Sequence, residues 1–256
     1  MPASLDPTVL TSTLRSEGEL LGARDGALIS IASDVPFDVA PAVDGSVVFV
    51  EQDRSVARHH GEQFELREQL VAPAPENRGV ILSPNGQAGV TVGFTEICAT
   101  DSCEDTLEAL RQFSPSGEGP ALLAAWWRVV HVYDDGTALV DAAIAEGTFE
   151  GAGEPPGPTL LLLGPDGQIR AQWEHDPRLW AREPVVLADG RVLLALEHFQ
   201  VDGQLLIVDA AATAISEVAE VDLGIYDVDR LAIDGLGERV AIVLSGTGGV
   251  IWGTLP

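Results

Sequence analysis

The feature that most constrains this chain is a phrase that occurs five times: an apolar β-type run, a turn containing glycine, and a second apolar run. The five turns contain Gly45, Gly86, Gly136, Gly190 and Gly235, which lie between 41 and 54 residues apart. Asp-Gly or Asn-Gly between such runs indicates a β-hairpin, because the primed turns that match strand twist need positive φ. Each phrase therefore predicts one hairpin.

A second, weaker hairpin falls between successive phrases. It is clearest at residues 159–173 and recurs at 205–218 and near 62–70. Two hairpins in each interval make four strands, the size of one propeller blade. The sequence thus predicts an all-β fold: a single β-propeller domain over residues 1–256, with about five four-stranded blades, or alternatively six.

Ring closure gives a further expectation. The last blade has three recognisable strands, near 229–233, 238–244 and 249–254, so a fourth is missing. Residues 27–32 form a good β segment without a hairpin partner, and we expect this N-terminal strand to close the ring and leave no exposed edge. Residues 1–24 would then form an arm or cap.

One blade has a family resemblance. The run Leu160-Leu161-Leu162-Leu163, followed by Asp166, Gly167 and Trp173, resembles a repeat of quinoprotein-type propellers. The other blades share only the spacing of its apolar runs and turns, and the Trp-Asp dipeptide of WD repeats is absent. The resemblance implies the propeller fold alone, since no floor for a quinone can be placed, and no cofactor is expected.

The charge balance limits the partners. The chain has 14 basic residues, all arginine, against 40 acidic ones, for a formal net charge of −26. Such a surface repels phosphate backbones and anionic lipids, so we expect no nucleic-acid partner and no membrane insertion. No signal peptide is visible at the N-terminus. A cytoplasmic monomer is expected if Met1 is the native start, and a periplasmic or extracellular protein if the chain is a processed form.

The arginines follow the repeat. Eight residues before the turn glycines, at the start of the strand that lines a propeller channel, stand Phe37, Arg78, Arg128, Arg182 and Asp227, with Arg230 three residues further on. Several guanidinium groups aimed into one channel would form an anion site, because their donors match carboxylate and phosphate geometry. Trp127 and His131 would add stacking and a titratable donor. In the alternative interpretation each arginine pairs with an acid of the next blade and holds the ring together.

These residues predict a noncatalytic binding module for a small anionic ligand or a protein partner. Nucleophile, phosphate-loop and dinucleotide motifs are absent, so no catalytic residue is predicted. The rival function is a hydrolase of glycosides or lactones that uses the channel carboxylates Asp38, Glu183 and Asp229. A third is a scaffold whose acidic rim recruits basic proteins.

The remaining polar groups suggest less. Cys98 and Cys103 form either a small surface-loop disulfide or a pair of free thiols, since a zinc site would need four ligands. His59-His60 stands beside Gly61 in a predicted turn, where we expect exposed histidines. Glu174-His175-Asp176 contains metal-ligand types, but successive strand residues point to opposite faces, so we expect solvated side chains and no metal site. Residues 107–113 fit one helical turn or a strand.

Overall fold

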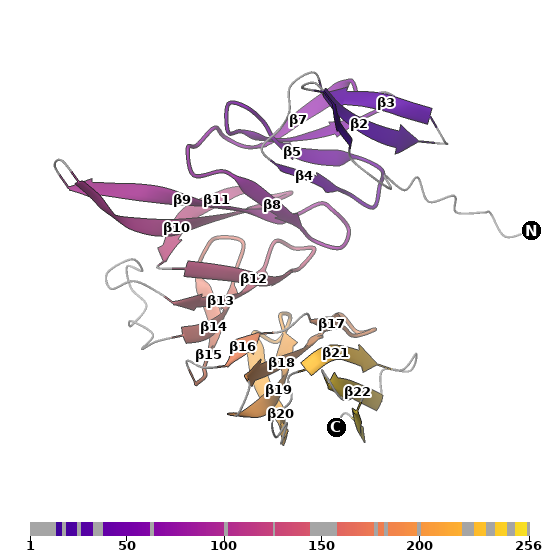
Figure 1. Cartoon of the computed structure of the whole chain (residues 1–256), viewed down its shortest axis with the longest axis vertical. Coiled ribbons are helices and arrows are strands. Elements are labelled where there is room, and N and C mark those ends of the chain that lie inside the picture. Colours follow the sequence, from indigo (N-terminus) through magenta and orange to yellow (C-terminus); the bar gives the residue numbers. More distant parts are fainter. Residues whose placement is uncertain are drawn as a thin grey trace, which may run out of the picture. The chain divides into compact units, whose positions relative to one another are not determined.

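The computed structural model describes residues 14–16, 19–24, 27–32, 38–61, 64–99, 102–124, 126–143, 158–176, 179–181, 184–198, 201–221, 228–233, 239–244 and 249–254. Every regular element within these ranges is a β-strand (Figure 1). The chain divides into two compact units: residues 1–123 with 132–136, and residues 124–131 with 137–256.

The first unit contains three antiparallel sheets whose strands follow one another in chain order. One has three strands: β1 (Leu14–Ser16), β2 (Glu19–Arg24) and β3 (Ala27–Ala32). The next has β4 (Asp38–Pro41), β5 (Val47–Val50), β6 (Val56–His60) and β7 (Leu66–Val71). The last has β8 (Gly79–Leu82), β9 (Gly89–Ala99), β10 (Ser102–Ser114) and β11 (Gly117–Ala124).

The second unit begins with a sheet of β12 (Trp126–Val132), β13 (Ala138–Ala143), β14 (Pro158–Leu163) and β15 (Ile169–Glu174). Its next sheet has β16 (Trp180–Ala181) and β17 (Val185–Val186), both paired with β18 (Val192–His198), then β19 (Val201–Asp209) and β20 (Ala214–Val221). Pro184, directly before β17, lacks an N–H, which suits an edge strand. The last sheet has β21 (Val228–Ile233), β22 (Arg239–Leu244) and β23 (Val250–Thr254).

The five predicted hairpins are confirmed. They are the pairs β4–β5, β8–β9, β12–β13, β17–β18 and β21–β22. The weaker hairpins are also present as β6–β7, β14–β15 and β19–β20. The described residues therefore form six sheets, which matches the larger of the two predicted blade numbers.

The reason given for the turn glycines needs correction. Gly45 N donates to Ala42 O, Gly45 has a φ of 82°, and Asp44 is not among the described non-glycine residues with positive φ. A primed type I′ turn would need positive φ at both central residues. The geometry is instead that of a type I turn followed by a left-handed glycine, and Gly167 N to Gly164 O and Gly190 N to Leu187 O repeat it.

The expectation that Ala27–Ala32 lacks a hairpin partner is wrong, whereas ring closure by this strand stays a prediction. This strand, β3, pairs with β2 from Arg24↔Ala27 to Leu20↔Ala32, and β2 pairs with β1. Residues predicted to form an arm or cap thus contribute two strands to a sheet of their own. The physical reason is local: Asp25-Gly26 stands between the partners Arg24 and Ala27, and a two-residue Asp-Gly connection costs far less loop entropy than pairing with the opposite end of the chain.

Each unit has an apolar core between neighbouring sheets. In the first, Val48, Val50 and Val56 pack with Val80 and Phe113 between the sheets of β4–β7 and β8–β11. In the second, Leu193, Leu205 and Ile207 pack with Leu231, Val240 and Ile242 between the sheets of β16–β20 and β21–β23. Face-to-face packing of neighbouring sheets is the arrangement of propeller blades.

Residues 107–113, which the sequence left between helix and strand, belong to strand β10. β8 pairs with β9 only over Gly89 to Val92, whereas β9 and β10 pair along nearly their whole length. The β9–β10 hairpin therefore runs out beyond β8 (Figure 1).

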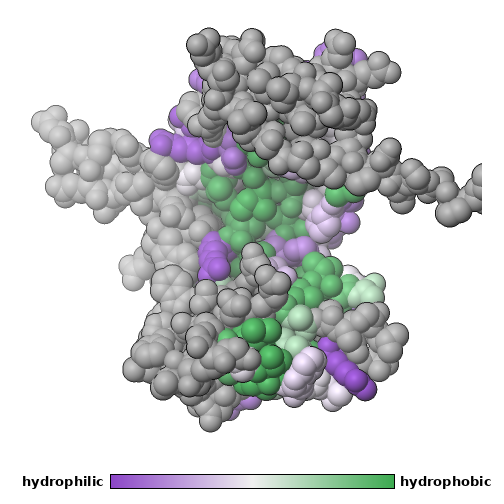
Figure 2. Space-filling view, turned by 45° about the vertical axis from the view of Figure 1, so that its right-hand side comes forward, coloured by the Kyte–Doolittle hydropathy of each residue, from purple (hydrophilic) through white to green (hydrophobic). Residues whose placement is uncertain are grey.

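Few large apolar side chains remain exposed among the described residues. They are Val43, Leu66, Ile81, Val186, Val250 and Trp252. Figure 2 shows apolar and polar side chains close together on one face. No helix in the described ranges is long and apolar enough to cross a membrane.

Candidate functional site

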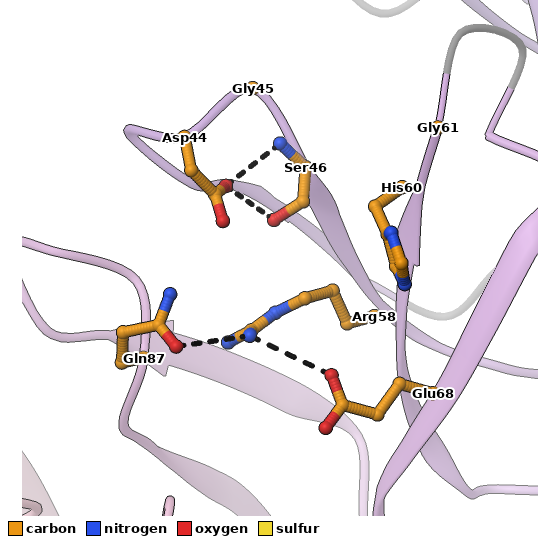
Figure 3. A pocket seen from close by; sticks show the side chains of 8 residues that line it. All are labelled: Asp44, Gly45, Ser46, Arg58, His60, Gly61, Glu68 and Gln87. Atoms are coloured by element: carbon orange, nitrogen blue, oxygen red, sulfur yellow. Dashed lines mark hydrogen bonds and ion pairs between the residues drawn. The ribbon is translucent and has the colours of Figure 1, made fainter.

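A polar pocket of about 450 Å³ lies in the first unit (Figure 3). Two turns and two strands contribute its lining. Asp44, Gly45 and Ser46 come from the β4–β5 turn, Arg58 and His60 from β6, Gly61 from the residue after β6, Glu68 from β7, and Gln87 from the β8–β9 turn. The pocket thus joins two neighbouring sheets, and its volume is in the range of small-molecule sites.

Arg58 is the buried charged residue of the pocket, with 8% of its surface exposed. Its Nη2 donates to Gly86 O at 2.5 Å, and its Nη1 donates to Gln87 Oε1 at 3.4 Å and lies 3.7 Å from Glu68 Oε2. Its Nε is buried and has no hydrogen-bond partner among the described residues. A buried donor of this kind is a group that ordered water or a ligand normally satisfies.

Asp44 stands at the rim opposite Glu68. Ser46 N and Ser46 Oγ both donate to Asp44 Oδ1, at 2.9 and 2.6 Å, so that Oδ2 is left toward the pocket (Figure 3). Partial burial raises the pKa of Asp44, but the Ser46 hydrogen bonds and the charges of Arg58 and His60 outweigh it and lower the pKa. Asp44 is therefore a carboxylate at neutral pH.

The pocket contains two carboxylates, Asp44 and Glu68, against one guanidinium, Arg58. Both carboxylates belong to exposed residues, so the acids form the rim and Arg58 forms the floor. His60, Ser46 and Gln87 add hydrogen-bonding groups of both kinds. The arrangement can hold a small polar molecule by several hydrogen bonds and favours positive over negative charge.

The predicted channel residues are only partly described. Arg78 is exposed and directly precedes β8, and Arg128 and His131 are half-buried on β12. Trp127 and Arg230 lie on β12 and β21, where only their backbone is described, and Arg182 lies outside the described residues. The predicted convergence of these arginines therefore stays a prediction.

Arg78 has a basic neighbour that the repeat did not indicate. Arg54, in the β5–β6 turn, has a pKa lowered by partial burial and by the charge of Arg78. Arg54 Nη1 donates to Asn77 O at 3.3 Å, and Arg54 has a φ of 67°. It occupies the turn position that glycine holds at Gly45, Gly86, Gly136, Gly167 and Gly190, so no glycine marked this turn in the sequence.

Among the carboxylates of the rival hydrolase, only Asp38 has a described side chain. Its Oδ1 accepts from its neighbour Val39 N and its Oδ2 from Val80 N, both at 2.9 Å. This carboxylate therefore ties β4 to β8. Glu183 lies outside the described residues, and Asp229 is described only in its backbone.

The sequence analysis did not predict a polar cluster around Glu51. Glu51 accepts hydrogen bonds from Arg67, His59 Nε2 and Ser55 Oγ, and these contacts, with Arg67 the largest, overcome partial burial and lower its pKa to about 2. His59 also packs against the ring of Phe49, with centroids 4.8 Å apart. His59 was thus predicted wrongly as a solvated turn residue, whereas its neighbour His60 is exposed.

His175 was also predicted wrongly as solvated, since its side chain is fully buried. Its Nε2 lies 3.1 Å from Asp141 Oδ1 and its Nδ1 lies 3.0 Å from Asp176 O. Because a carboxylate oxygen and a carbonyl oxygen both accept hydrogen bonds, this geometry favours the doubly protonated imidazolium form of the ring. Burial lowers the pKa of His175, but the hydrogen bonds to Asp141 and Asp176 outweigh it and raise the pKa. Nothing in the sequence indicated that Asp141 contacts His175, which lies 34 positions later in the chain.

Within the described ranges, no three His, Cys, Asp or Glu side chains gather in a way that could hold a metal ion. No family model matches the chain, and no curated protein matches it.

Solved structures do resemble it. The chain is similar to Pyrococcus horikoshii acylaminoacyl peptidase, with 13% identity and a TM-score of 0.54 over 91% of this chain but only 39% of the peptidase. It is also similar to Kuenenia stuttgartiensis hydrazine synthase, with 12% identity and a TM-score of 0.49 over 93% of this chain and 71% of that one. A third similar structure is the β-propeller domain of Myceliophteria thermophila Cps50, with 14% identity and a TM-score of 0.45 over 96% and 89% of the two chains.

At these identities the likeness is one of fold alone. The described antiparallel sheets have three to five strands that follow one another along the chain, and two neighbouring sheets pack face to face in each unit. The chain has an all-β fold of the β-propeller type.

Proposed function

We propose that the protein is a noncatalytic binding module, and that its Arg58 pocket binds a small polar ligand carrying an ammonium group. The observation that carries this proposal is the pocket itself, with a buried guanidinium on its floor and two carboxylates on its rim. The Arg58 Nε donor lacks a partner among the described residues, and a hydroxyl or ether oxygen of such a ligand, rather than its ammonium group, would supply the acceptor.

The charge of the pocket argues for a cationic ligand. Arg58 is already engaged by Gly86 O, Gln87 and Glu68, so little of its donor capacity is left for an anion. Asp44 Oδ2 takes neither Ser46 bond. An ammonium group between Asp44 and Glu68 would gain charge-assisted hydrogen bonds, and the net charge of −26 draws cations toward the protein.

The carboxylates of the pocket favour binding over hydrolysis. A glycosidase needs one carboxyl group with a raised pKa to act as general acid. The pKa of Asp44 is lowered instead, because the Ser46 hydrogen bonds stabilise the charged form. The pKa of Asp44 therefore gives no support to the hydrolase function that the sequence left as an alternative.

The test is a titration calorimetry panel of three hexoses that share a ring and differ in charge: glucosamine, glucose and glucuronate. Glucosamine should bind more tightly than the other two. Glu68→Gln removes one charge-assisted partner and should weaken glucosamine binding about tenfold, corresponding to about 1.4 kcal/mol. Glu68 is largely exposed, so the variant should fold normally.

Asp135→Asn is the matched control. It removes an exposed carboxylate of the same unit outside the pocket and keeps a residue suited to its turn. This variant should bind glucosamine as the parent does. If none of the three sugars binds, or if both variants weaken glucosamine binding equally, the pocket is not the ligand site.

A second candidate is the anion site that the arginine pattern predicts. The observation in its favour is that burial and then the positive charge of Arg78 lower the pKa of Arg54. Two guanidinium groups held close together favour an anionic ligand between them. Binding of glucuronate that is lost in Arg78→Ala and kept in Glu68→Gln would establish this site as separate from the pocket.

A further inference from the structure

The two cysteines are opposite partners in the backbone register of the β9–β10 hairpin. The register pairs Cys98 with Cys103, and the pair Ala99↔Ser102 lies between them and the end of the hairpin. Only Thr100 and Asp101 separate Ala99 from Ser102 in the sequence. The register irregularity of this hairpin falls after Cys103, between Cys103 and Asp105, so it does not displace the pair.

The position of this pair in the ladder suits a disulfide. In a hairpin with a two-residue connection, the residues flanking the connection form a hydrogen-bonded pair, and the next pair is not hydrogen-bonded. Residues opposite one another at such a site have Cα atoms about 4.5 Å apart. A disulfide accepts Cα separations of about 4.4–6.8 Å. The backbone alone therefore brings Cys98 and Cys103 within bonding range without rearrangement.

We propose that Cys98 and Cys103 form a reversible cross-strand disulfide that covalently links β9 and β10 near the end of their hairpin. The oxidant is a low-molecular-weight disulfide. The thiolate of one cysteine attacks it and releases one thiol, and the second cysteine then attacks the mixed disulfide and releases the other. Two protein thiols lose two electrons and two protons, and one small disulfide becomes two thiols.

The bond would act on a local segment. β9 and β10 continue beyond the part of β9 that pairs with β8, so the end of the hairpin is stabilised mainly by the β9–β10 ladder. A covalent link next to the two-residue connection would keep this segment paired under conditions that fray an unlinked hairpin. The first unit would thus contain a hairpin whose order depends on the redox poise of its surroundings.

The test uses the purified full chain in glutathione buffers of increasing oxidised-to-reduced ratio. The protein is then denatured, alkylated and cleaved with trypsin. Trypsin cleaves after Arg78 and Arg111, so both cysteines fall in one peptide, residues 79–111. On oxidation this peptide should take up no alkylating agent and be lighter by about 2 Da, the mass of the two hydrogens lost. In reducing buffer it should take up two alkyl groups.

A register-shifted variant, Ser102→Cys with Cys103→Ser, is the matched control. It keeps two cysteines in the same hairpin but moves one by a single position, to the opposite face of the strand. It should need an oxidised-to-reduced ratio about tenfold or more higher to close, since its Cβ directions diverge. The proposal is wrong if this variant oxidises as readily as the parent. It is also wrong if the parent peptide stays fully alkylated or gains two glutathione groups in oxidising buffer.

Discussion

At the scale of single residues, the carboxylate of Glu51 shows how neighbouring donors set a charge state. Arg67, His59 and Ser55 all donate to it. Asp53, two residues away, belongs to the same turn but is exposed. The two acids therefore form a matched pair: they lie close together in the chain but differ in the number of side chains that donate hydrogen bonds to them.

We predict that Glu51→Gln lowers the free energy of unfolding by about 1–2 kcal/mol at pH 7. The folded pKa of about 2 lies below the reference value of 4.5. The stabilisation is thus fully present above pH 4.5 and is lost as the pH falls toward 2. Urea unfolding of parent and variant between pH 7 and pH 3 measures the difference, which should shrink by more than half. Asp53→Asn is the control, and a difference independent of pH would contradict the assignment.

At the scale of elements, the turn glycines allow a sharper comparison. Gly86 and Gly190 both have positive φ, of 73° and 86°. A Cβ added at Gly86 would lie 2.5 Å from the Cβ of Ala42, whereas one added at Gly190 would meet nothing within 4 Å. The two positions thus share a backbone requirement and differ in the space around them.

Gly190→Ala should cost about 1 kcal/mol, the cost of placing a side chain on left-handed backbone. Gly86→Ala should cost about twice that or more, because Ala42 must also move. Equilibrium unfolding in urea, with equal slopes for both variants, is the measurement. Equal losses of stability would mean that the approach of the β8–β9 turn to Ala42 is not tight.

The hairpins were predictable because their turns combine local signals: an Asp-Gly or Asn-Gly step between two β-type runs. The β5–β6 turn escaped the pattern because Arg54 takes the left-handed position there. The partner of Ala27–Ala32 was missed although the Asp25-Gly26 step before it is the same kind of hairpin signal. Local turn chemistry predicts which strands pair, and it does so better than a global symmetry argument.

At the scale of the whole molecule, the repeat predicted the propeller type of fold but not the pocket. Arg58 and Glu68 lie on neighbouring strands, and Asp44 and Gln87 come from turns of two different sheets. Arg58 and Glu68 stand at no repeated position, and the repeat that includes Asp44 predicts its turn but not its neighbours, so spacing could not indicate that these residues meet. His175 and Asp141 are a similar case, because their contact depends on how β13 and the segment after β15 pack.

The measurement that tests the proposed function most directly is a glucosamine titration followed by ¹H–¹⁵N correlation spectra of the full chain, with Glu68→Gln beside the parent. If the pocket is the site, the amide signals of Ser46, Gly61 and Gln87 should shift progressively in the parent and much less in the variant. Signals of the second unit, such as Gly190, should stay in place. Spectra that do not change, or shifts that are equally large in the variant, would contradict the account.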